Sequence, residues 1–452
     1  MTVAELAQSL AGAQEPRATL VARALAGAKA AEALNIFTSL DENAVTLAAA
    51  ARRGGPPRPL EGIPIAVKDN LAVAGQPFSG GSRAIGTARA VADAGAVARL
   101  RDAGAVVIGK TNLHEFAFGV TSNNAAYGAV ENPSVPGHSA GGSSGGAAAA
   151  VAAGIVPISL GTDTGGSGRI PAAFCGCVGF RPSTARYPGS GVLQLTWTLD
   201  TVATFAKHVA DIRLLDNIIC GAVAGQTPPD PARLCLGVPR DSFVADLDGP
   251  VARAFDKALG VLDRAGVRLI PIDLAEVLSL DRQAARPIAL FEAAAIWRRE
   301  LARRGIAENR FIRGIASPDV KAIFDQLLND GVSTSDYALA MNEGLRPIRH
   351  IYGRVFAGGI DALVFPTVPV PPPPLGENDT VCVNGAGRPL FPTIVRNTSP
   401  GTLAAIPGIS LPFGTMDGGM PFGLEIDGAA GTDTRLLAMA ETIEKLALGA
   451  GV

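Results

Sequence analysis

A lysine and two glycine- and serine-rich segments carry the residue types that could perform chemistry in this chain of 452 residues. Lys68, one of only seven lysines, directly follows the apolar run Gly62–Val67. Burial at that point would disfavour the ammonium form and lower the pKa of Lys68, so that a neutral amine could act as a base near neutral pH. The alternative is a surface lysine at the end of a strand, with its ammonium group in water.

The segment Gly161–Pro171 (GTDTGGSGRIP) has the features of a loop that presents a nucleophile. It follows the apolar run Val156–Leu160, and a serine in a glycine-rich loop after a strand lies beside free backbone N–H groups. Asp163 and Arg169 bracket the loop, where an ion pair between them would hold its shape. Four consecutive residues could direct N–H groups at one oxyanion: Thr164, Gly165, Gly166 and Ser167. The alternative is a tight structural turn.

The segment Gly141–Gly146 (GGSSGG) opens a helix that we expect at Gly145–Ala153. Glycines at a helix entrance permit unusual backbone angles and close approach of the chain, although a flexible loop would have the same composition. The segment also matches the G-x-S-x-G pattern of serine hydrolases, with Ser144 as nucleophile, but that chemistry requires a later histidine. Only His208 and His350 follow, and both are typical of surface or packing positions, so the pattern does not predict a Ser-His triad.

Short apolar runs alternate with helical patterns along the chain, which predicts an α/β fold. A break is expected at Gly54–Pro57. Strands are expected at Ile63–Val67, Ala105–Ile108, Val156–Leu160, Leu234–Val238, Val267–Ile272, Ala362–Phe365 and Gly423–Ile426. Helices are expected at Glu42–Arg53, Gly145–Ala153, Val251–Ala265, Arg286–Arg304, Tyr337–Phe356 and Asp433–Leu448, with a further helix ending at Ala103.

The run Gly104–Thr111 (GAVVIGKT) matches the phosphate-binding pattern G-x-x-x-x-G-K-[ST]. Such a loop needs the N–H groups of its middle residues free to bind anions. Ala105–Ile108 is apolar and is expected to form a buried strand, whose N–H groups would be taken by the sheet. We therefore expect no nucleotide site here.

Composition and charge exclude several other classes of protein. Hydrophobic residues make up 48% of the chain, which excludes an intrinsically disordered protein. The net charge of -2 argues against a nucleic-acid-binding protein built on a basic surface. The uncharged stretch Asn132–Thr162 consists mostly of glycine, alanine and serine and contains Pro157, so we expect no membrane span.

The N-terminus and the cysteines indicate the compartment. The first residues include acidic side chains and lack the apolar core of a secretory signal. The five cysteines are scattered, apart from Cys175 and Cys177, and form no zinc-ligand pattern. We interpret all five as small buried thiols in a reducing compartment and expect a cytoplasmic protein.

Three motifs resemble those of the amidase signature family. They are GGSSGG, GTDTGGSGRIPAAFCGCVGFRPS and, upstream, PIAVKDN. The spacing between Lys68, Ser143 and Ser167 is usual for that family. The likeness continues through HEFAFGVTSNNAAYG and RNTSPGTLAAIPGISLP, and so covers most of residues 60–447.

The resemblance implies an α/β fold of the amidase-signature type, in which a large mixed central β-sheet is covered by helices on both faces. It implies a single domain over residues 1–452. This domain would comprise a catalytic core segment (60–215) and a remainder (232–447) that completes the sheet and supplies helices around the substrate. An N-terminal helical segment (1–55) would pack on this core, and its helices are predicted by the helical spacing of Val21, Ala24, Leu25 and Ala28. No metal or organic cofactor is implied.

The resemblance also implies roles for individual residues. Lys68 corresponds to the base, Ser143 to a bridging serine that relays the proton, and Ser167 to the nucleophile. The backbone N–H groups of residues 164–167 correspond to the oxyanion hole. The family's bridging serine follows a cis peptide bond, which implies a cis bond between Gly142 and Ser143. Three residues are expected to support these loops: Ser144, Asp163 and Arg169.

Within the family, the runs FAFGVTSNNAAYG, FRPSTARYPGSGV and SPGTLAAIPG are most similar to indoleacetamide and mandelamide hydrolases. This implies a small-molecule substrate, an aryl or arylalkyl amide, cleaved through a serine acyl-enzyme to a carboxylate and ammonia or an amine. Two departures concern the substrate: Gly168 stands where most members have an aliphatic residue, and Ala147 stands where a serine is common.

Two alternative functions stay open. The chain could be the amidase subunit of a tRNA-dependent amidotransferase, or it could hydrolyse anilides or aryl carbamates. The low charged fraction of 18% is compatible with a buried homodimer interface. No nucleic-acid or membrane partner is expected.

Overall fold

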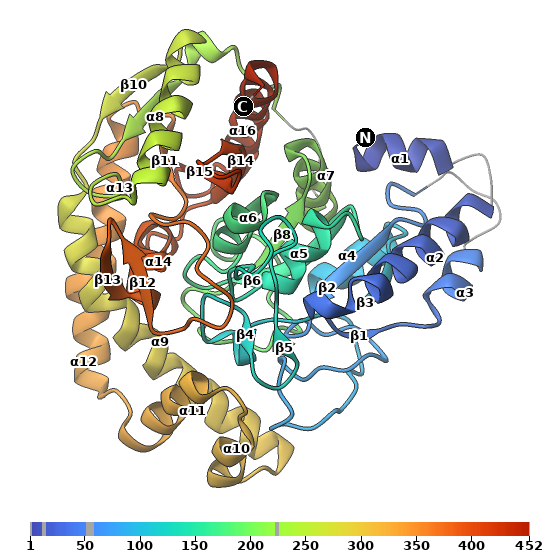
Figure 1. Cartoon of the computed structure of the whole chain (residues 1–452). Coiled ribbons are helices and arrows are strands. Elements are labelled where there is room, and N and C mark those ends of the chain that lie inside the picture. Colours follow the sequence, from blue (N-terminus) through green and yellow to red (C-terminus); the bar gives the residue numbers. More distant parts are fainter. Residues whose placement is uncertain (1, 11–14, 51–57, 222–225, 452) are drawn as a thin grey trace.

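The computed structural model describes residues 2–10, 15–50, 58–221 and 226–451 (Figure 1). The break expected at Gly54–Pro57 lies outside the described residues. Residues 51–53 of the helix expected at Glu42–Arg53 also lie outside them, and the described part of that helix is α3 (Ala44–Ala49).

Eleven strands form one mixed sheet through the middle of the molecule, in the order β1-β3-β2-β6-β8-β7-β14-β15-β11-β9-β10. Their bounds are β1 (Phe37–Leu40), β2 (Pro64–Lys68), β3 (Val106–Thr111), β6 (Ile158–Asp163), β7 (Val178–Arg181), β8 (Thr201–Ala206), β9 (Cys235–Val238), β10 (Arg268–Pro271), β11 (Ala362–Pro366), β14 (Gly408–Thr415) and β15 (Pro421–Gly428). β2 pairs in parallel with both β3 and β6, whereas β6, β8, β7, β14 and β15 pair successively in antiparallel fashion. The predicted mixed α/β sheet is confirmed.

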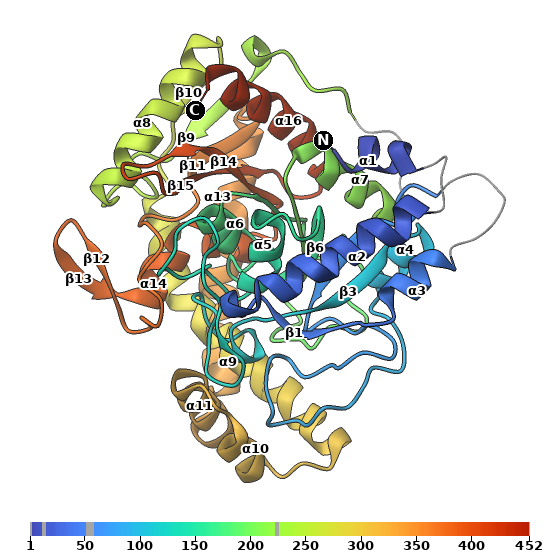
Figure 2. The ribbon, with the colours of Figure 1, turned by 45° about the vertical axis from the view of Figure 1, so that its right-hand side comes forward.

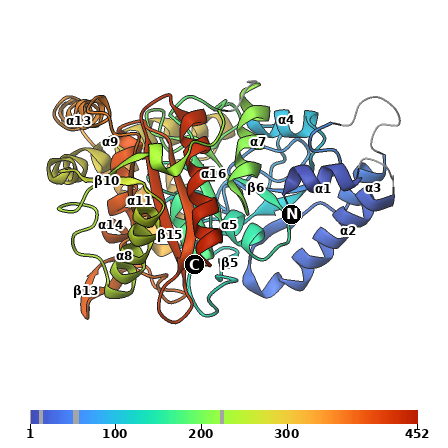
Figure 3. The ribbon, with the colours of Figure 1, turned by 90° about the horizontal axis from the view of Figure 1, so that it is seen from above.

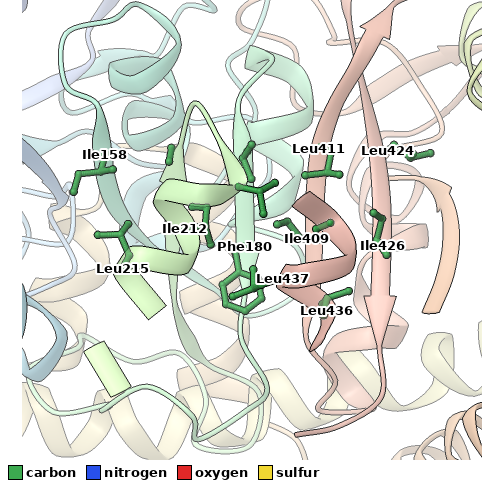
Figure 4. Packing of buried hydrophobic residues seen from close by; sticks show 14 of the residues in the cluster. Ile158, Phe180, Ile212, Leu215, Ile409, Leu411, Leu424, Ile426, Leu436 and Leu437 are labelled. Carbon is green, nitrogen blue, oxygen red and sulfur yellow. The ribbon is translucent and has the colours of Figure 1, made fainter. Parts of the chain in front are cut away.

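Helices cover both faces of this sheet because successive residues of a strand point to opposite sides. Ile65 and Val67 of β2 belong to the hydrophobic cluster on one face, which also includes residues of α4 (Gly95–Asp102), α7 (Val209–Cys220), α8 (Gly249–Arg264) and α16 (Asp433–Ala450). Figure 4 shows residues of α7 and α16 in this cluster. Ala66, between them, faces the other side and packs with α2 (Glu15–Ala30) and α5 (Gly145–Ala152). Figure 3 shows α7 and α16 side by side, and Figure 2 shows α2 crossing the opposite face.

The remaining elements complete the molecule (Figures 1 and 2), and among them α6 (Arg169–Cys175) packs on β7, β14 and β15 in the middle of the sheet. Two short hairpins are β4 (Asn123–Asn124) with β5 (Gly128–Ala129), and β12 (Thr380–Val383) with β13 (Ala386–Pro389). The other helices are α1 (Val3–Leu10), α9 (Ala275–Arg304), α10 (Glu308–Gly314), α11 (Pro318–Asp325), α12 (Thr334–Leu339), α13 (Arg346–Ala357), α14 (Leu390–Ile394) and α15 (Ser399–Leu403). No helix in the described residues is both long and apolar enough to cross a bilayer.

Several predictions made from local patterns were wrong. The helix expected to begin at Arg286 begins at Ala275 and continues through Pro287, because packing of α9 in the core outweighs the local preference of proline. The helix expected at Tyr337–Phe356 is interrupted by a wider π-helical turn at Ala340–Leu345. Cys382 is exposed and Cys220 only half-buried, so the expectation of five buried thiols holds for three of them.

The phosphate-loop interpretation was correctly rejected. Val106–Thr111 forms β3, which pairs with β1 on one side and β2 on the other. The N–H groups of the GAVVIGKT motif are therefore used within the sheet rather than turned toward an anion.

The topology brings the chemistry-bearing segments to one edge of the sheet. β2 and β6 are parallel neighbours, so Lys68 at the end of β2 and Asp163 at the end of β6 lie at the same edge. The loop after β6 leads directly into α6, and the GGSSGG segment leads into α5. This convergence of carboxyl ends and helix entrances is where an α/β fold usually builds its site.

Candidate active site

Lys68 is completely buried at the end of β2, as the sequence predicted for a base. Its Nζ lies 2.8 Å from each of three hydroxyl oxygens: Ser143 Oγ, Ser144 Oγ and Thr162 Oγ1. No carboxylate pairs with Lys68 among the described residues. The ammonium form is therefore solvated only by neutral hydroxyls.

This environment lowers the pKa of Lys68 to about 7, from the usual 10.5. The main cause is removal of the side chain from water, which penalises its charged form. The negative charges of Asp163 and Asp200 act in the opposite direction but do not compensate for the burial. Near neutral pH a large fraction of Lys68 is consequently an uncharged amine with a free lone pair.

Ser143 is buried next to Lys68, and the Gly142–Ser143 peptide bond is cis, as the resemblance implied. Its carbonyl oxygen accepts a hydrogen bond from the backbone N–H of His114 at 3.0 Å and from Ser122 Oγ at 3.3 Å. A Cβ on Gly142 would collide with the backbone of residues 120–122, which is why glycine is required there. Ser143 is thus held by its backbone, while its hydroxyl contacts Lys68.

Ser144 links the entrance of α5 to β6. Its Oγ donates to the carbonyl oxygen of Thr162 at 3.0 Å and accepts from the Thr162 N–H at 3.3 Å, in addition to its contact with Lys68. Because the Ser144 hydroxyl proton is already bound to a carbonyl, Ser144 can only accept from Lys68. The Ser143 hydroxyl has no other acceptor among the described residues and is free to give its proton to a neutral amine.

The predicted ion pair between Asp163 and Arg169 is confirmed, and it is part of a larger buried network. Arg169 Nε lies 3.0 Å from Asp163 Oδ2, and its Nη1 lies 3.1 Å from Glu425 Oε1 on β15. Arg181 Nη1 reaches the same Asp163 carboxylate at 3.3 Å. The two guanidinium groups hold the pKa of Asp163 well below its usual range, despite complete burial. The Asp163 carboxylate is therefore charged at any working pH.

Asp163 also shapes the loop that carries Ser167. Its two oxygens accept the backbone N–H groups of Gly166, at 2.8 Å, and of Gly168, at 3.0 Å. The N–H of Gly166 is thereby occupied, although sequence reasoning placed it in the oxyanion hole. The other N–H groups expected there have no hydrogen-bond partner in the described part of the chain: those of Thr164, Gly165 and Ser167.

Ser167 is 8% exposed, in the turn between β6 and α6. Its hydroxyl makes no hydrogen bond to Ser143 or to any other described residue. The structure therefore brings together Lys68, Ser143 and Ser144, and separately Asp163 and Arg169, without joining Ser167 to the first group by a hydrogen bond.

Sequence reasoning missed residues that complete the site. Thr162 Oγ1 accepts from both Lys68 and Asn70, and Asp200 Oδ1 accepts from the hydroxyl of Thr164. Thr398 donates to the carbonyl oxygen of Gly165. The sequence signal that could have indicated Thr162 and Thr398 is their position within two recognised motifs, GTDTGGS and RNTSPGT. For Asp200 no motif marks the position.

The chain resembles known amide hydrolases in sequence over most of its length. The family model described as Amidase matches residues 19–437. A mandelamide hydrolase of Pseudomonas putida is 37% identical, over 92% of this chain and 85% of its own length. An indoleacetamide hydrolase of Rhizobium radiobacter is 36% identical, over 94% of this chain and 92% of its own length.

Solved structures of similar proteins share the fold. A crystal structure of an amidase is 34% identical and superposes with a TM-score of 0.87 over all of both chains. A glutamyl-tRNA(Gln) amidotransferase subunit of Thermotoga maritima is 28% identical, with a TM-score of 0.79 over 98% of this chain and 94% of that chain.

Proposed function

This chain belongs to the amidase family and is a hydrolase of amide C–N bonds, and on that premise we propose that its substrate is a small aryl or arylalkyl amide. The products are a carboxylate and ammonia or an amine. Support for the aryl group comes from the mandelamide and indoleacetamide hydrolases, which match nearly the whole chain at 36–37% identity. The observation that carries the mechanism is the buried Lys68, whose pKa is about 7 and whose Nζ contacts three hydroxyls.

The reaction begins with attack of Ser167 Oγ on the amide carbonyl carbon. The Ser167 proton moves to Ser143 Oγ as the Ser143 proton moves to the lone pair of neutral Lys68. A hydroxyl suits this relay because it donates and accepts at once. Ser143 is the relay rather than Ser144, because the Ser144 proton is bound to the Thr162 carbonyl.

The tetrahedral intermediate places a negative charge on the former carbonyl oxygen. N–H groups of Gly165 and Ser167, with that of Thr164 beside them, bind this charge, since none has another partner within the described residues. Gly166 does not contribute, because its N–H is held by Asp163.

Breakdown of the intermediate returns the proton from Lys68 through Ser143 to the leaving nitrogen. The C–N bond breaks, ammonia or an amine leaves, and the acyl group remains as an ester on Ser167. Water then attacks that ester, with Lys68 and Ser143 again removing the proton, and releases the carboxylate. The chain's own residues supply every proton transfer.

The experiment that tests this function is a panel of aryl, arylalkyl and alkyl amides, with anilides, aryl carbamates and esters included. Release of ammonia or amine is followed, and Ser167→Ala serves as the blank. Preferred turnover of arylacetamides, lost in Ser167→Ala, supports the proposal. Preferred turnover of anilides or carbamates would replace the proposed substrate, and equal turnover by Ser167→Ala would remove Ser167 as nucleophile.

The likeness to an amidotransferase subunit favours a second candidate function, ammonia supply inside a multisubunit complex. The higher identity to the mandelamide and indoleacetamide hydrolases makes the small-molecule reaction the preferred one. Pull-down from the native host separates the two, because the amidotransferase role requires partner subunits. We further propose a cytoplasmic enzyme that is a homodimer, for which light scattering of the purified protein gives the mass.

A further inference from the structure

Thr398 lies directly before α15 with its side chain completely buried against the loop that carries Ser167. Its Oγ1 donates to the carbonyl oxygen of Gly165 at 2.7 Å, although the two residues are 233 positions apart in the chain. A second acceptor, the Val395 carbonyl, lies farther away at 3.3 Å. The hydroxyl of Thr398 is therefore used mainly on the Gly165–Gly166 peptide.

The same peptide is held at its other end. The N–H of Gly166 donates to Asp163 Oδ1 at 2.8 Å, while the carbonyl of Gly165 accepts from Thr398. Because a peptide unit is planar and its C=O and N–H point in opposite directions, these two bonds fix its orientation. The peptides on either side carry the N–H groups of Gly165 and Ser167, so their direction depends on this fixed unit.

Gly166 and Thr398 also fit each other sterically. A Cβ at Gly166 would overlap the Cβ and Oγ1 of Thr398, and the φ of Gly166 is +130°, where side chains are rarely tolerated. The close approach is therefore possible only with glycine at 166. This steric fit is independent of the hydrogen bond and shows that the loop packs tightly against Thr398.

The backbone of Thr398 is anchored to the same buried network. Its carbonyl oxygen accepts from Arg169 Nη2 at 3.0 Å, and Arg169 pairs with Asp163. Removal of the Thr398 hydroxyl alone would leave this anchor in place but would leave the Gly165 carbonyl as an unpaired, part-buried acceptor. The peptide would then keep only one of the two hydrogen bonds that fix its orientation, the one from the Gly166 N–H to Asp163.

We infer that Thr398 is a positioning residue for the oxyanion hole, acting through the Gly165 carbonyl and not on the substrate. The inference rests on the proposed function of the same site. Its energetic effect falls on the tetrahedral intermediate, in which the N–H groups of Gly165 and Ser167 donate to an oxygen with a full negative charge. The ground-state amide, whose carbonyl is only polarised, gains less from the same groups.

The test compares Thr398→Val, Thr398→Ser and wild type, with phenylacetamide as substrate. Benzyl trifluoromethyl ketone is the probe for the intermediate: Ser167 Oγ adds to the ketone carbon, its proton passes to Lys68, and the ketone oxygen becomes an oxyanion. Phenylacetate, the product, probes binding of the acyl group alone. Thr204→Val is the matched control, because the buried Thr204 hydroxyl has no partner in the described residues.

Thr398→Val should lower kcat by about tenfold to a hundredfold, the range expected when a part-buried acceptor that orients the oxyanion hole loses its donor, with KM changed less than about threefold. Its affinity for the ketone should fall by the same factor as kcat/KM, while the affinity for phenylacetate stays unchanged. Thr398→Ser should restore both values, and Thr204→Val should match wild type. Circular dichroism verifies folding, and Thr398→Ala takes the place of a Thr398→Val variant that does not fold.

The inference is overturned if the valine or alanine variant keeps kcat and ketone affinity within about twofold of wild type. It is also overturned if phenylacetate binding weakens as much as ketone binding, because that pattern indicates general loosening of the pocket. Failure of the proposed function would give a different result. In that case the wild-type protein would not release ammonia from phenylacetamide, or the Ser167→Ala variant would still release it.

Discussion

Loss of the hydroxyl group should affect mainly stability at Ser144 and mainly activity at Ser143, the two adjacent serines of the GGSSGG segment. Each Oγ lies 2.8 Å from Lys68 Nζ, so the distance to the base does not distinguish them. Their other contacts do: Ser144 Oγ also binds the N–H and the carbonyl of Thr162, whereas Ser143 Oγ binds no other described residue. Ser144→Ala is therefore mainly a structural change, and Ser143→Ala removes the proton relay.

The magnitudes follow from these bonds. Ser144→Ala removes three buried hydrogen bonds, which should lower the free energy of unfolding by about 1–3 kcal/mol. Ser143→Ala removes one and should lower it by less than about 1 kcal/mol. For activity the order reverses, because loss of a positioned proton-transfer group lowers kcat/KM by about 10²–10⁴-fold. Ser144→Ala should lower kcat/KM by about tenfold, because Lys68 loses one of its three neighbours.

The assay combines ammonia release from an arylacetamide at pH 8, where Lys68 is mostly neutral, with urea unfolding of each variant. Ser159→Ala is the control, since Ser159 is a buried serine of β6 whose Oγ donates to the Ala147 carbonyl at 2.7 Å, outside the relay. It should lose stability but keep kcat/KM within about twofold. If Ser144→Ala is the more inactive variant, or if both serines respond equally, the assignment of the relay to Ser143 is refuted.

Two further predictions concern Lys68. With increasing pH, kcat/KM should rise through an apparent pKa of about 7 as Lys68 loses its proton. Asp200→Asn should lower this apparent pKa, because it removes a negative charge that raises the pKa of Lys68. An apparent pKa that Asp200→Asn leaves unchanged would contradict the electrostatic account. Lys68→Met should be inactive yet gain stability at low pH. The pKa of Lys68 is 10.5 in the unfolded chain and about 7 in the folded protein. Between pH 7 and 10.5 the free energy of unfolding of wild type should therefore increase with pH, by up to about 1.4 kcal/mol per pH unit. Urea unfolding at about pH 6.5 and 9.5 should show this increase in wild type but not in Lys68→Met.

Local patterns predicted the chemistry-bearing residues because their signals lie within short stretches of sequence. An apolar run that ends in a lysine predicted the burial of Lys68, and the order of strand, glycine-rich loop and serine predicted the turn after β6. Asp163 and Arg169 lie six positions apart, so their ion pair could also be read locally. Each of these inferences needed only a few consecutive residues.

The contacts that complete the site could not be predicted in this way. Thr398 and Glu425 reach the loop from more than two hundred positions downstream, and their positions depend on how β14 and β15 enter the sheet. The hydrogen bond from the Gly166 N–H to Asp163 depends on the direction in which the Asp163 side chain points at the end of β6. Similarly, α9 continues through Pro287 because tertiary packing overrides a local preference.

The most direct test of the central claim is nuclear magnetic resonance of the protein labelled with ¹³C at the lysine Cε positions. Only seven lysines are present, and the signal that disappears in Lys68→Met belongs to Lys68. The account predicts that this signal titrates near pH 7. A Lys68 signal that titrates above pH 9 would show a charged ammonium at neutral pH and would contradict the proposed base.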